Sequence, residues 1–368
     1  QKPTGADLRT ERPTGGLLAS PYGYAKHGQS GLEISELLPN LAQHADELCV
    51  LRSCHTDNPN HGPALLLMNN GTMTERVPSM GSWLSYGLGN ENANLPSFVV
   101  LLDHQGAPVN GALNWSNGFM PAAYQGVPFR SSGEPVLFLN NPQGVDDATQ
   151  RDTLDVLKQL NEERLNVVGD PEIASRINSF ELAYRMQQTA PELMDISKEP
   201  QHILDMYGAK PGEASFANNC LLARRLIESG VRFVQLFHEA WDHHGGLTGG
   251  LKTQCGLTDK PCAALVRDLK QRGLLEDTIV IWGGEFGRTP FREGRTATSD
   301  ILGRDHFPDA FSLFLAGGGV RRGGIRSARR REGKCAQGAQ GRRTNRAGFQ
   351  DGLRHTDHRE NADPGGLN

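Results

Sequence analysis

The sequence predicts an α/β fold in which a mostly parallel sheet is flanked by helices. Short apolar runs, rich in β-branched and aromatic residues, alternate along the chain with segments of helical period. Most of these runs are apolar at consecutive positions, as expected for parallel strands that are buried on both faces. The 368 residues, of which 37% are hydrophobic and 22% charged, suffice to build a sizeable core.

Six segments have the length and composition of strands. They are Leu48–Arg52, Ser97–Leu102, Val136–Leu139, Val231–Phe237, Thr278–Trp282 and Ala310–Leu315. Residues 103–135 are rich in Gly, Pro, Asn and Ser and show little period, which predicts a long loop over the sheet edge. No strand is expected before Gly16.

Helical spacing of apolar residues is clear in three segments. They are Ile173–Tyr184, Phe216–Ile227 and Cys262–Leu269. The first of them belongs to a helical insertion between strands, over residues 150–195. The last has Asp259 as a candidate N-cap, Pro261 in its first turn and Gly273 as its stop signal.

The charge distribution divides the chain into two parts. Residues 321–368 hold 12 of the 38 Lys and Arg but only 5 of the 42 Asp and Glu. Residues 327–368 have too few apolar residues to form a core. Three interpretations compete for them: a basic tail that contacts nucleic acid or anionic lipid, a flexible extension, and translation in the wrong reading frame. We favour the last, and therefore expect an α/β domain over residues 1–326 and a basic, disordered tail over 327–368.

The composition of the remaining, acidic part excludes several functions. It lacks the basic face that nucleic-acid binding requires. We find no apolar stretch long enough to span a membrane and no signal peptide. The six cysteines form no CxxC pair, which argues against a structural zinc ribbon, whereas pairing of Cys255 with Cys262 stays open.

Four polar segments lie beside predicted strands, where open α/β sheets bind their ligands. The first, Cys54–His61, precedes an apolar helical run. Asn60 can cap that helix, and the free N–H groups of its first turn favour an anion such as phosphate or sulfate. The simpler alternative is a capped turn with two surface histidines.

The second polar segment is Phe237–Gly246, after a predicted strand. In an extended chain Asp242 and His244 point the same way, so that both can bind one ion, while His243 faces elsewhere. A mixed oxygen and nitrogen donor set suits zinc or manganese better than calcium. The alternative is an ordinary polar loop.

The third and fourth segments are Trp282–Pro290, with Glu285 and Arg288, and Gly303–Pro308, with Asp305 and His306. Each alone could be a salt-bridged turn. Together with the second segment, however, they place two carboxylates and two imidazoles at one end of the sheet. Arg288 is available for an anionic substrate oxygen.

The order of these motifs resembles a known family. Trp-Asp-x-His at 241–244 is followed by Gly-Glu-Phe-Gly-Arg-Thr-Pro at 284–290 and by Gly-Arg-Asp-His-x-Pro at 303–308, which leads into an apolar strand and Ala-Gly-Gly-Gly-Val. This set resembles the bacterial family called domain of unknown function 1501, which is sulfatase-like and belongs to the alkaline phosphatase superfamily. The resemblance spans about residues 18–326.

The resemblance implies an alkaline phosphatase-like fold and hydrolysis of a small anionic phosphate or sulfate ester. In that superfamily two divalent metal ions bind the ester, and a hydroxyl or thiol at a helix N-terminus attacks it. Carried over, Asp242, His244 and His306 form one metal site, Glu285 serves the other, and Asp305 joins the metal ligands. Thr56, Asn60, His61 and Arg288 take the catalytic places, with Thr56 as the candidate nucleophile. Zinc or manganese is the expected cofactor.

The chain departs from the family pattern in three places. Nothing before Gly16 supplies the first ligand of the second metal, Phe286 stands where the superfamily often has histidine, and the Arg-rich tail replaces a final Asp-Leu-His-Ala-Thr segment. We therefore expect a fold that is incomplete at both ends and that has lost part of the second metal site. A non-catalytic, secreted or envelope binding protein is the alternative. By resemblance, the compartment is periplasmic or extracellular.

Overall fold

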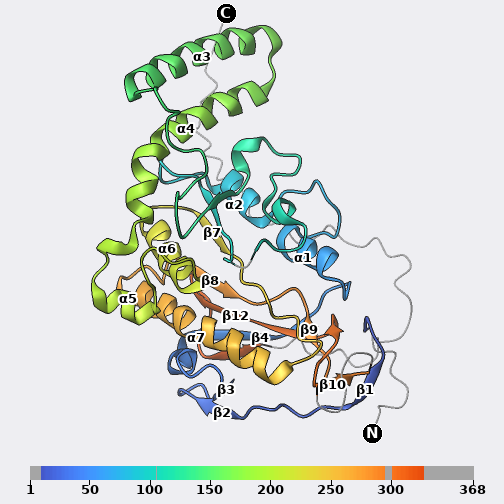
Figure 1. Cartoon of the computed structure of the whole chain (residues 1–368). Helices are drawn as coiled ribbons and strands as arrows, with labels where there is room; N and C mark the ends of the chain where they lie inside the picture. Colours follow the sequence, from blue (N-terminus) through green and yellow to red (C-terminus); the bar gives the residue numbers. More distant parts are fainter. Residues whose placement is uncertain (1–9, 105, 295–300, 327–368) are drawn as a thin grey trace, which may run out of the picture. The chain divides into compact units, whose positions relative to one another are not determined.

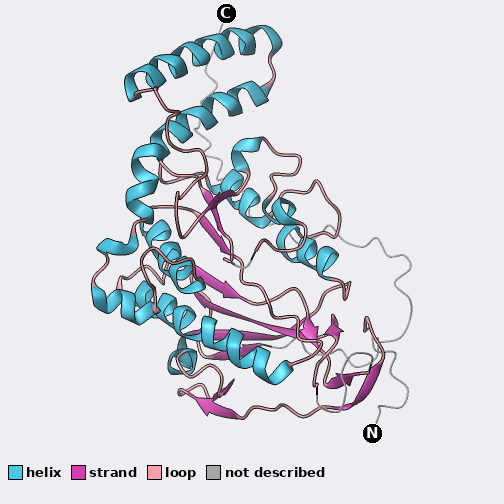
Figure 2. Cartoon of the chain, viewed as in Figure 1, coloured by secondary structure: helices cyan, strands magenta, loops and turns pink. Residues whose placement is uncertain are grey.

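A computed structural model describes residues 10–104, 106–294 and 301–326, and its strands form two larger sheets and three small ones (Figures 1 and 2). The four-stranded sheet has the order β13 (Gly324–Arg326), β4 (Leu48–Cys54), β12 (Phe311–Gly317) and β8 (Ile279–Trp282). The three-stranded sheet has the order β6 (Val127–Phe129), β5 (Phe98–Leu101) and β7 (Phe233–Leu236). The two-stranded sheets pair β1 (Thr14–Leu17) with β10 (Phe291–Glu293), β2 (Tyr24–His27) with β3 (Leu32–Ser35), and β9 (Gly287–Arg288) with β11 (His306–Phe307).

The α-helices lie between β4 and β8 along the chain. The α-helices are α1 (His61–Asn70), α2 (Met80–Leu88), α3 (Asp147–Val168), α4 (Pro171–Met194), α5 (Gln201–Tyr207), α6 (Phe216–Glu228) and α7 (Leu247–Gln271). Short 3-10 helices are η1 (Leu41–Glu47), η2 (Gly111–Trp115), η3 (Ala122–Tyr124) and η4 (Ile196–Lys198). The mixed α/β class is thus confirmed. Within the described segments, no helix combines the length and apolar character needed to cross a bilayer.

The expected parallel pairing holds for only part of the structure. β5 is parallel to both β6 and β7, and β13 is parallel to β4, but β12 is antiparallel to β4 and β8. The reason is the connection from β8 to β12. It contains short strands and no described helix, whereas a parallel return would need a crossover, which is usually helical.

Five of the six predicted strands are present, and Val136–Leu139 is wrong. That segment forms turns, with Phe138 at φ +58° and 93% exposed. The third strand of the sheet is β6, inside the predicted loop, where its central Pro128 weakened the strand signal; the proline is tolerated because β6 is an edge strand. A strand also occurs before Gly16, since β1 begins at Thr14.

The helix predicted around Cys262 is longer than its punctuation suggested. α7 begins at Leu247, and Asp259 lies inside it, where its carboxylate accepts the backbone N–H groups of Asn40 and Leu41 at 2.9 and 2.8 Å instead of capping α7. α7 contains three glycines and a proline. These residues disfavour helix, so the sequence did not reveal the first half of α7. Cys255 and Cys262 are both free, because they lie seven positions apart on one helix, a rise of roughly 10 Å.

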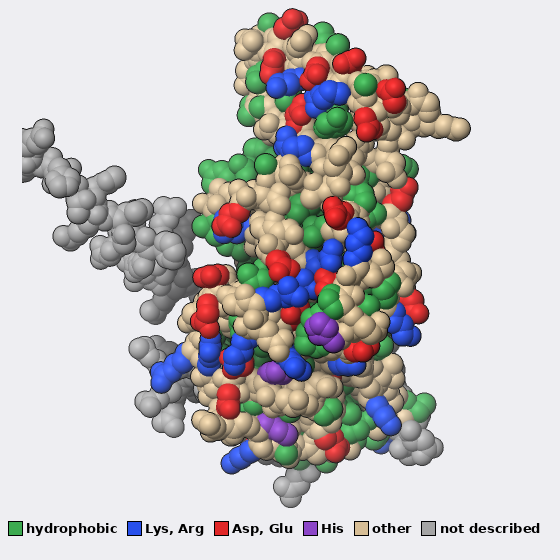
Figure 3. Space-filling model, turned by 90° about the vertical axis from the view of Figure 1, so that its left-hand side faces the viewer, with side chains coloured by type: hydrophobic (Ala, Val, Ile, Leu, Met, Phe, Trp, Pro, Cys, Tyr) green, Lys and Arg blue, Asp and Glu red, His purple; other side chains and the backbone are tan. Residues whose placement is uncertain are grey.

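The predicted helical insertion is present as α3 and α4, which lie side by side in Figure 1. Arg151 of α3 bonds Glu181 of α4 at 2.8 Å and joins the two helices. The predicted tail, residues 327–368, lies outside the described residues. On the face shown in Figure 3, Lys and Arg side chains are interspersed with Asp and Glu.

Three apolar clusters of buried residues form the core. The largest packs against the three-stranded sheet and includes Leu101, Leu221 and Tyr207. The second joins the four-stranded sheet to α7 through Phe314 and Leu269, among others. The third is small and contains Phe98, Val100 and Trp115. α7 contributes residues to the first two clusters.

A candidate metal centre

Four chain segments reach the same end of the structure because of the sheet topology. β4 and β8 end there, and β12 begins there, since it is antiparallel to both: Phe311 pairs with Cys54 at the start of β12. The pairing of β9 with β11 places His306 opposite Arg288, which joins the third and fourth polar segments. The loop after β7 carries the second.

Three of the predicted metal ligands converge. The Oδ1 atom of Asp242 lies 2.9 Å from His244 Nε2 and 3.0 Å from His306 Nε2, and the two imidazole nitrogens are 3.1 Å apart. The carboxylate and the two rings therefore meet at one point, as the sequence predicts.

The other nitrogen of each ring is held by an oxygen. His306 Nδ1 lies 2.6 Å from the carbonyl oxygen of Pro59, which can only accept a hydrogen bond, and 3.0 Å from Glu11 Oε2. His244 Nδ1 donates to Glu293 Oε2 at 2.6 Å. In both rings Nδ1 thus carries a proton, so that in a neutral ring the lone pair of Nε2 points toward the partner ring. This is the arrangement in which outer oxygens orient metal-binding histidines.

This geometry suits a divalent cation. Two unprotonated nitrogens and a carboxylate oxygen about 3 Å apart repel one another unless positive charge lies between them. Zinc bonds to such atoms at about 2.0–2.2 Å, and the set of two nitrogens and one oxygen suits zinc or manganese better than calcium. Further acidic groups and one more histidine lie close by. Two further sets of described residues have ligand atoms within 4.8 Å of one another: His61, Asp242 and His306, and Glu11, His244, Asp305 and His306.

His61, the first residue of α1, is held by two carboxylates. Its Nδ1 donates to Glu285 Oε1 at 2.5 Å, and its Nε2 lies 3.3 Å from Asp242 Oδ2. The hydrogen bonds with Asp242 and then Glu285 outweigh burial and raise the pKa of His61 to about 9. In this geometry the His61 ring is therefore protonated on both nitrogens, and positively charged, at neutral pH.

Asp242 stays ionised in spite of its half-buried position. Burial opposes its charge, but the close contacts with His306 and His61 and the charge of Arg288 outweigh burial and hold the pKa of Asp242 well below its usual range. The guanidinium of Arg288 lies 2.7 Å from Asp242 Oδ1. Arg288 thus stands beside the point where the three ligand atoms meet.

Asp305 is fully buried next to this cluster. Its Oδ2 accepts the backbone N–H of Arg12 at 2.6 Å, while its Oδ1 is buried with no hydrogen-bond partner among the described residues. A carboxylate that lacks such a partner is costly to bury. A nearby cation would offset that cost.

A match to a family model shows which protein family this chain belongs to. The model described as "Protein of unknown function (DUF1501)" matches residues 1–338. The chain belongs to the DUF1501 family. The match extends beyond the resemblance at 18–326 at both ends and includes all the residues of the cluster. No curated protein matches this DUF1501 chain.

Phe286 covers the histidines of the DUF1501 site. Its ring centroid lies 4.9 Å from that of His61 and 4.4 Å from that of His306, and the Arg288 guanidinium lies over it at 5.8 Å. The phenyl ring directly follows Glu285 in the sequence. It restricts the motion of two rings but offers no ligand atom.

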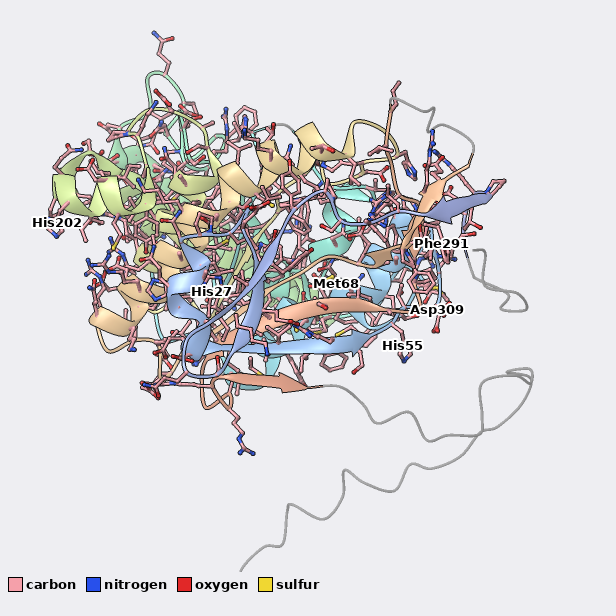
Figure 4. All side chains as sticks on the ribbon, turned by 90° about the horizontal axis from the view of Figure 1, so that it is seen from below. His27, His55, Met68, His202, Phe291 and Asp309 are labelled. Atoms are coloured by element: carbon pink, nitrogen blue, oxygen red, sulfur yellow. The ribbon has the colours of Figure 1, made fainter. Side chains whose placement is uncertain are left out.

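The remaining residues of the first polar segment have different surroundings. Asn60 caps α1, as predicted, because its side chain accepts the N–H of Gly62 at 3.1 Å. Thr56 is 4% exposed, and its hydroxyl has no described hydrogen-bond partner. Its role as nucleophile stays a prediction. His55 is exposed, at the end of the molecule where Phe291 and Asp309 lie (Figure 4).

Sequence reasoning missed the groups that orient the ligands. Glu293 is fully buried, bonds His244 and also pairs with Arg12 at 3.0 Å. Its segment, Phe-Arg-Glu, carries no signal that separates it from any short strand. Glu11 was missed for a different reason, since the region before Gly16 was expected to contribute nothing. Pro59 acts through its carbonyl group, which every residue has.

Proposed function

We propose that this protein is a metal-dependent hydrolase of phosphate or sulfate esters. The observation that carries the proposal is the meeting of Asp242, His244 and His306 at one point, next to Arg288. These three side chains would hold a zinc or manganese ion. When bound, the ion supplies positive charge that attracts an ester oxygen and offsets the negative charge that develops during reaction.

The remaining groups match the needs of ester cleavage. Arg288 presents N–H groups that can bind anionic oxygens of the ester. Protonated His61 can donate its proton to the leaving oxygen, and Glu285 fixes the orientation of its ring. General acid catalysis of this kind contributes about 10²- to 10⁴-fold to the rate.

The leaving-group dependence of hydrolysis tests this assignment. We expect His61→Gln to slow phenyl phosphate hydrolysis by about 10²- to 10⁴-fold, because phenolate leaves poorly without a proton. The same variant should slow 4-nitrophenyl phosphate far less, since 4-nitrophenolate needs no proton. Rates are measured on zinc-loaded and manganese-loaded protein, with the corresponding sulfate esters in parallel.

His55→Gln is the matched control, because His55 is an exposed histidine of the same segment. It should hydrolyse both esters at the wild-type rate. Equal losses for both esters in His61→Gln would contradict its role as the general acid. Absence of metal-dependent turnover of any phosphate or sulfate ester would contradict the hydrolase proposal itself.

Two observations favour a second candidate, a non-catalytic binding protein that keeps the fold. Thr56, the candidate nucleophile, is buried, and Phe286 offers no ligand for a second metal. This alternative predicts that the metal-loaded protein binds inorganic phosphate or sulfate without turning over either ester. Titration calorimetry with both anions, beside the kinetic assay, separates the two candidates.

A further inference from the structure

A cavity of about 380 Å³ adjoins the candidate metal centre. Its walls are largely apolar, and Arg288 and Arg304 line it. The other lining residues are Ser20, Pro21, Tyr24, Leu247, Leu251, Thr289, Pro290, Phe307 and Ala310. Because Arg288 also contacts Asp242, the cavity and the cluster share a side chain.

Arg304 is a cation without a described counter-anion. Its guanidinium donates to three backbone carbonyls, those of Thr289 at 2.8 Å, Leu18 at 2.9 Å and Ala19 at 3.3 Å. Within the described part of the chain, no carboxylate lies at ion-pair distance from it. Burial lowers the pKa of Arg304, and Tyr24 only partly opposes this effect.

The partly buried charge of Arg304 costs free energy unless an anionic ligand binds to it. Carbonyl groups orient a guanidinium but do not neutralise it, and a partly buried charge without a counter-ion is unfavourable. The three carbonyls take three of the five N–H groups of Arg304. The remaining N–H groups can bind an anion in the cavity.

We propose that this cavity binds the non-reacting part of the substrate, an apolar and preferably aromatic group that carries a second anionic substituent, and that Arg304 recognises that anion. The inference rests on the proposed function, because it assumes that the ester binds at the neighbouring cluster. Tyr24, Leu251 and Phe307 provide the apolar walls, and Arg288 lies between the reacting ester and the cavity. The preferred ester thus has two anionic groups joined by an apolar spacer.

Two non-hydrolysable probes test the inference by calorimetry on the zinc-loaded full chain. Phenylphosphonate carries the reacting anion alone, and 4-carboxyphenylphosphonate adds a carboxylate across the ring. We expect 4-carboxyphenylphosphonate to bind about 10- to 100-fold more tightly than phenylphosphonate, because its carboxylate gains a charge-assisted hydrogen bond from Arg304. Arg304→Gln should remove this preference and leave the affinity for phenylphosphonate unchanged. Arg304→Lys should keep part of the preference.

Two further variants distinguish the loss of the anion site from a loss of folding. Leu251→Glu leaves the carbonyl contacts of Arg304 intact and places a negative charge in the cavity wall, so it should also remove the preference. Arg52→Gln, an exposed arginine of β4, is the control and should keep it. Equal binding of both probes to wild-type protein, or an unchanged preference in Arg304→Gln and Leu251→Glu, would overturn the inference.

A third probe, benzoate, separates this inference from the proposed function. If phenylphosphonate binds only with metal but the carboxylate adds nothing, the hydrolase proposal stands and the cavity inference fails. If neither phosphonate shows metal-dependent binding, yet benzoate binds to wild-type protein and not to Arg304→Gln, the cavity is an anion site and the proposed function fails.

Discussion

Replacement of Asp242 by asparagine should lower the affinity for zinc by more than about 100-fold. Asp242 supplies the only carboxylate oxygen among the three converging atoms and lies within 3.0 Å of both imidazole nitrogens. Loss of groups that merely orient a ligand costs about 10- to 100-fold in metal affinity, and loss of the ligand charge itself should cost more. Competition with a chelator of known zinc affinity measures the change.

Asp309→Asn is the control for this experiment. Asp309 is an exposed carboxylate three residues after His306, at the end of the molecule where Figure 4 labels His55 and Phe291. It should bind zinc like the wild type. If Asp242→Asn retained wild-type affinity, the converging atoms would not be the metal site, even if the protein bound zinc elsewhere.

The second large effect concerns stability. Asp268→Ala should lower the free energy of unfolding by about 3–5 kcal/mol, because it leaves Arg224 as a buried, incompletely compensated cation. Arg224 is 2% exposed, and its Nε lies 3.0 Å from Asp268 Oδ2. The same carboxylate accepts hydrogen bonds from Tyr207 and Arg272, at 3.1 and 2.8 Å. Urea denaturation followed by circular dichroism measures the difference.

Asp277→Ala serves as the comparison, since Asp277 is exposed just after the end of α7. Its effect should stay within about 0.5 kcal/mol, as for most surface substitutions. A loss below 1 kcal/mol in Asp268→Ala would show that Glu199 and Glu228 satisfy Arg224 without it, and that this buried network does not hold α6 against α7.

The sequence predicted the convergence of three polar side chains better than it predicted the sheet topology. Asp242, His244 and His306 were identified because their residue types are dense beside apolar strands, a pattern that does not depend on strand direction. The antiparallel course of β12 was not predicted, since an apolar run has no directional signal. Its direction follows from the absence of a described helix between β8 and β12.

Two other kinds of error have physical causes. α7 was shortened because glycines and a proline lower helix propensity, although its packing against both larger sheets overrides that preference. Glu293 was missed because its importance arises from burial against His244, which only tertiary structure shows. Long-range contacts therefore supply what local patterns lack.

The most direct test of the account is X-ray absorption spectroscopy at the zinc edge on protein loaded with one equivalent of zinc. We expect a first shell with two imidazole nitrogens and a carboxylate oxygen at about 2.0–2.2 Å, together with the outer-shell scattering that imidazole rings produce. The imidazole scattering should weaken in His306→Gln. A shell of oxygen atoms without imidazole scattering in the wild-type protein would contradict the central claim that Asp242, His244 and His306 bind one cation.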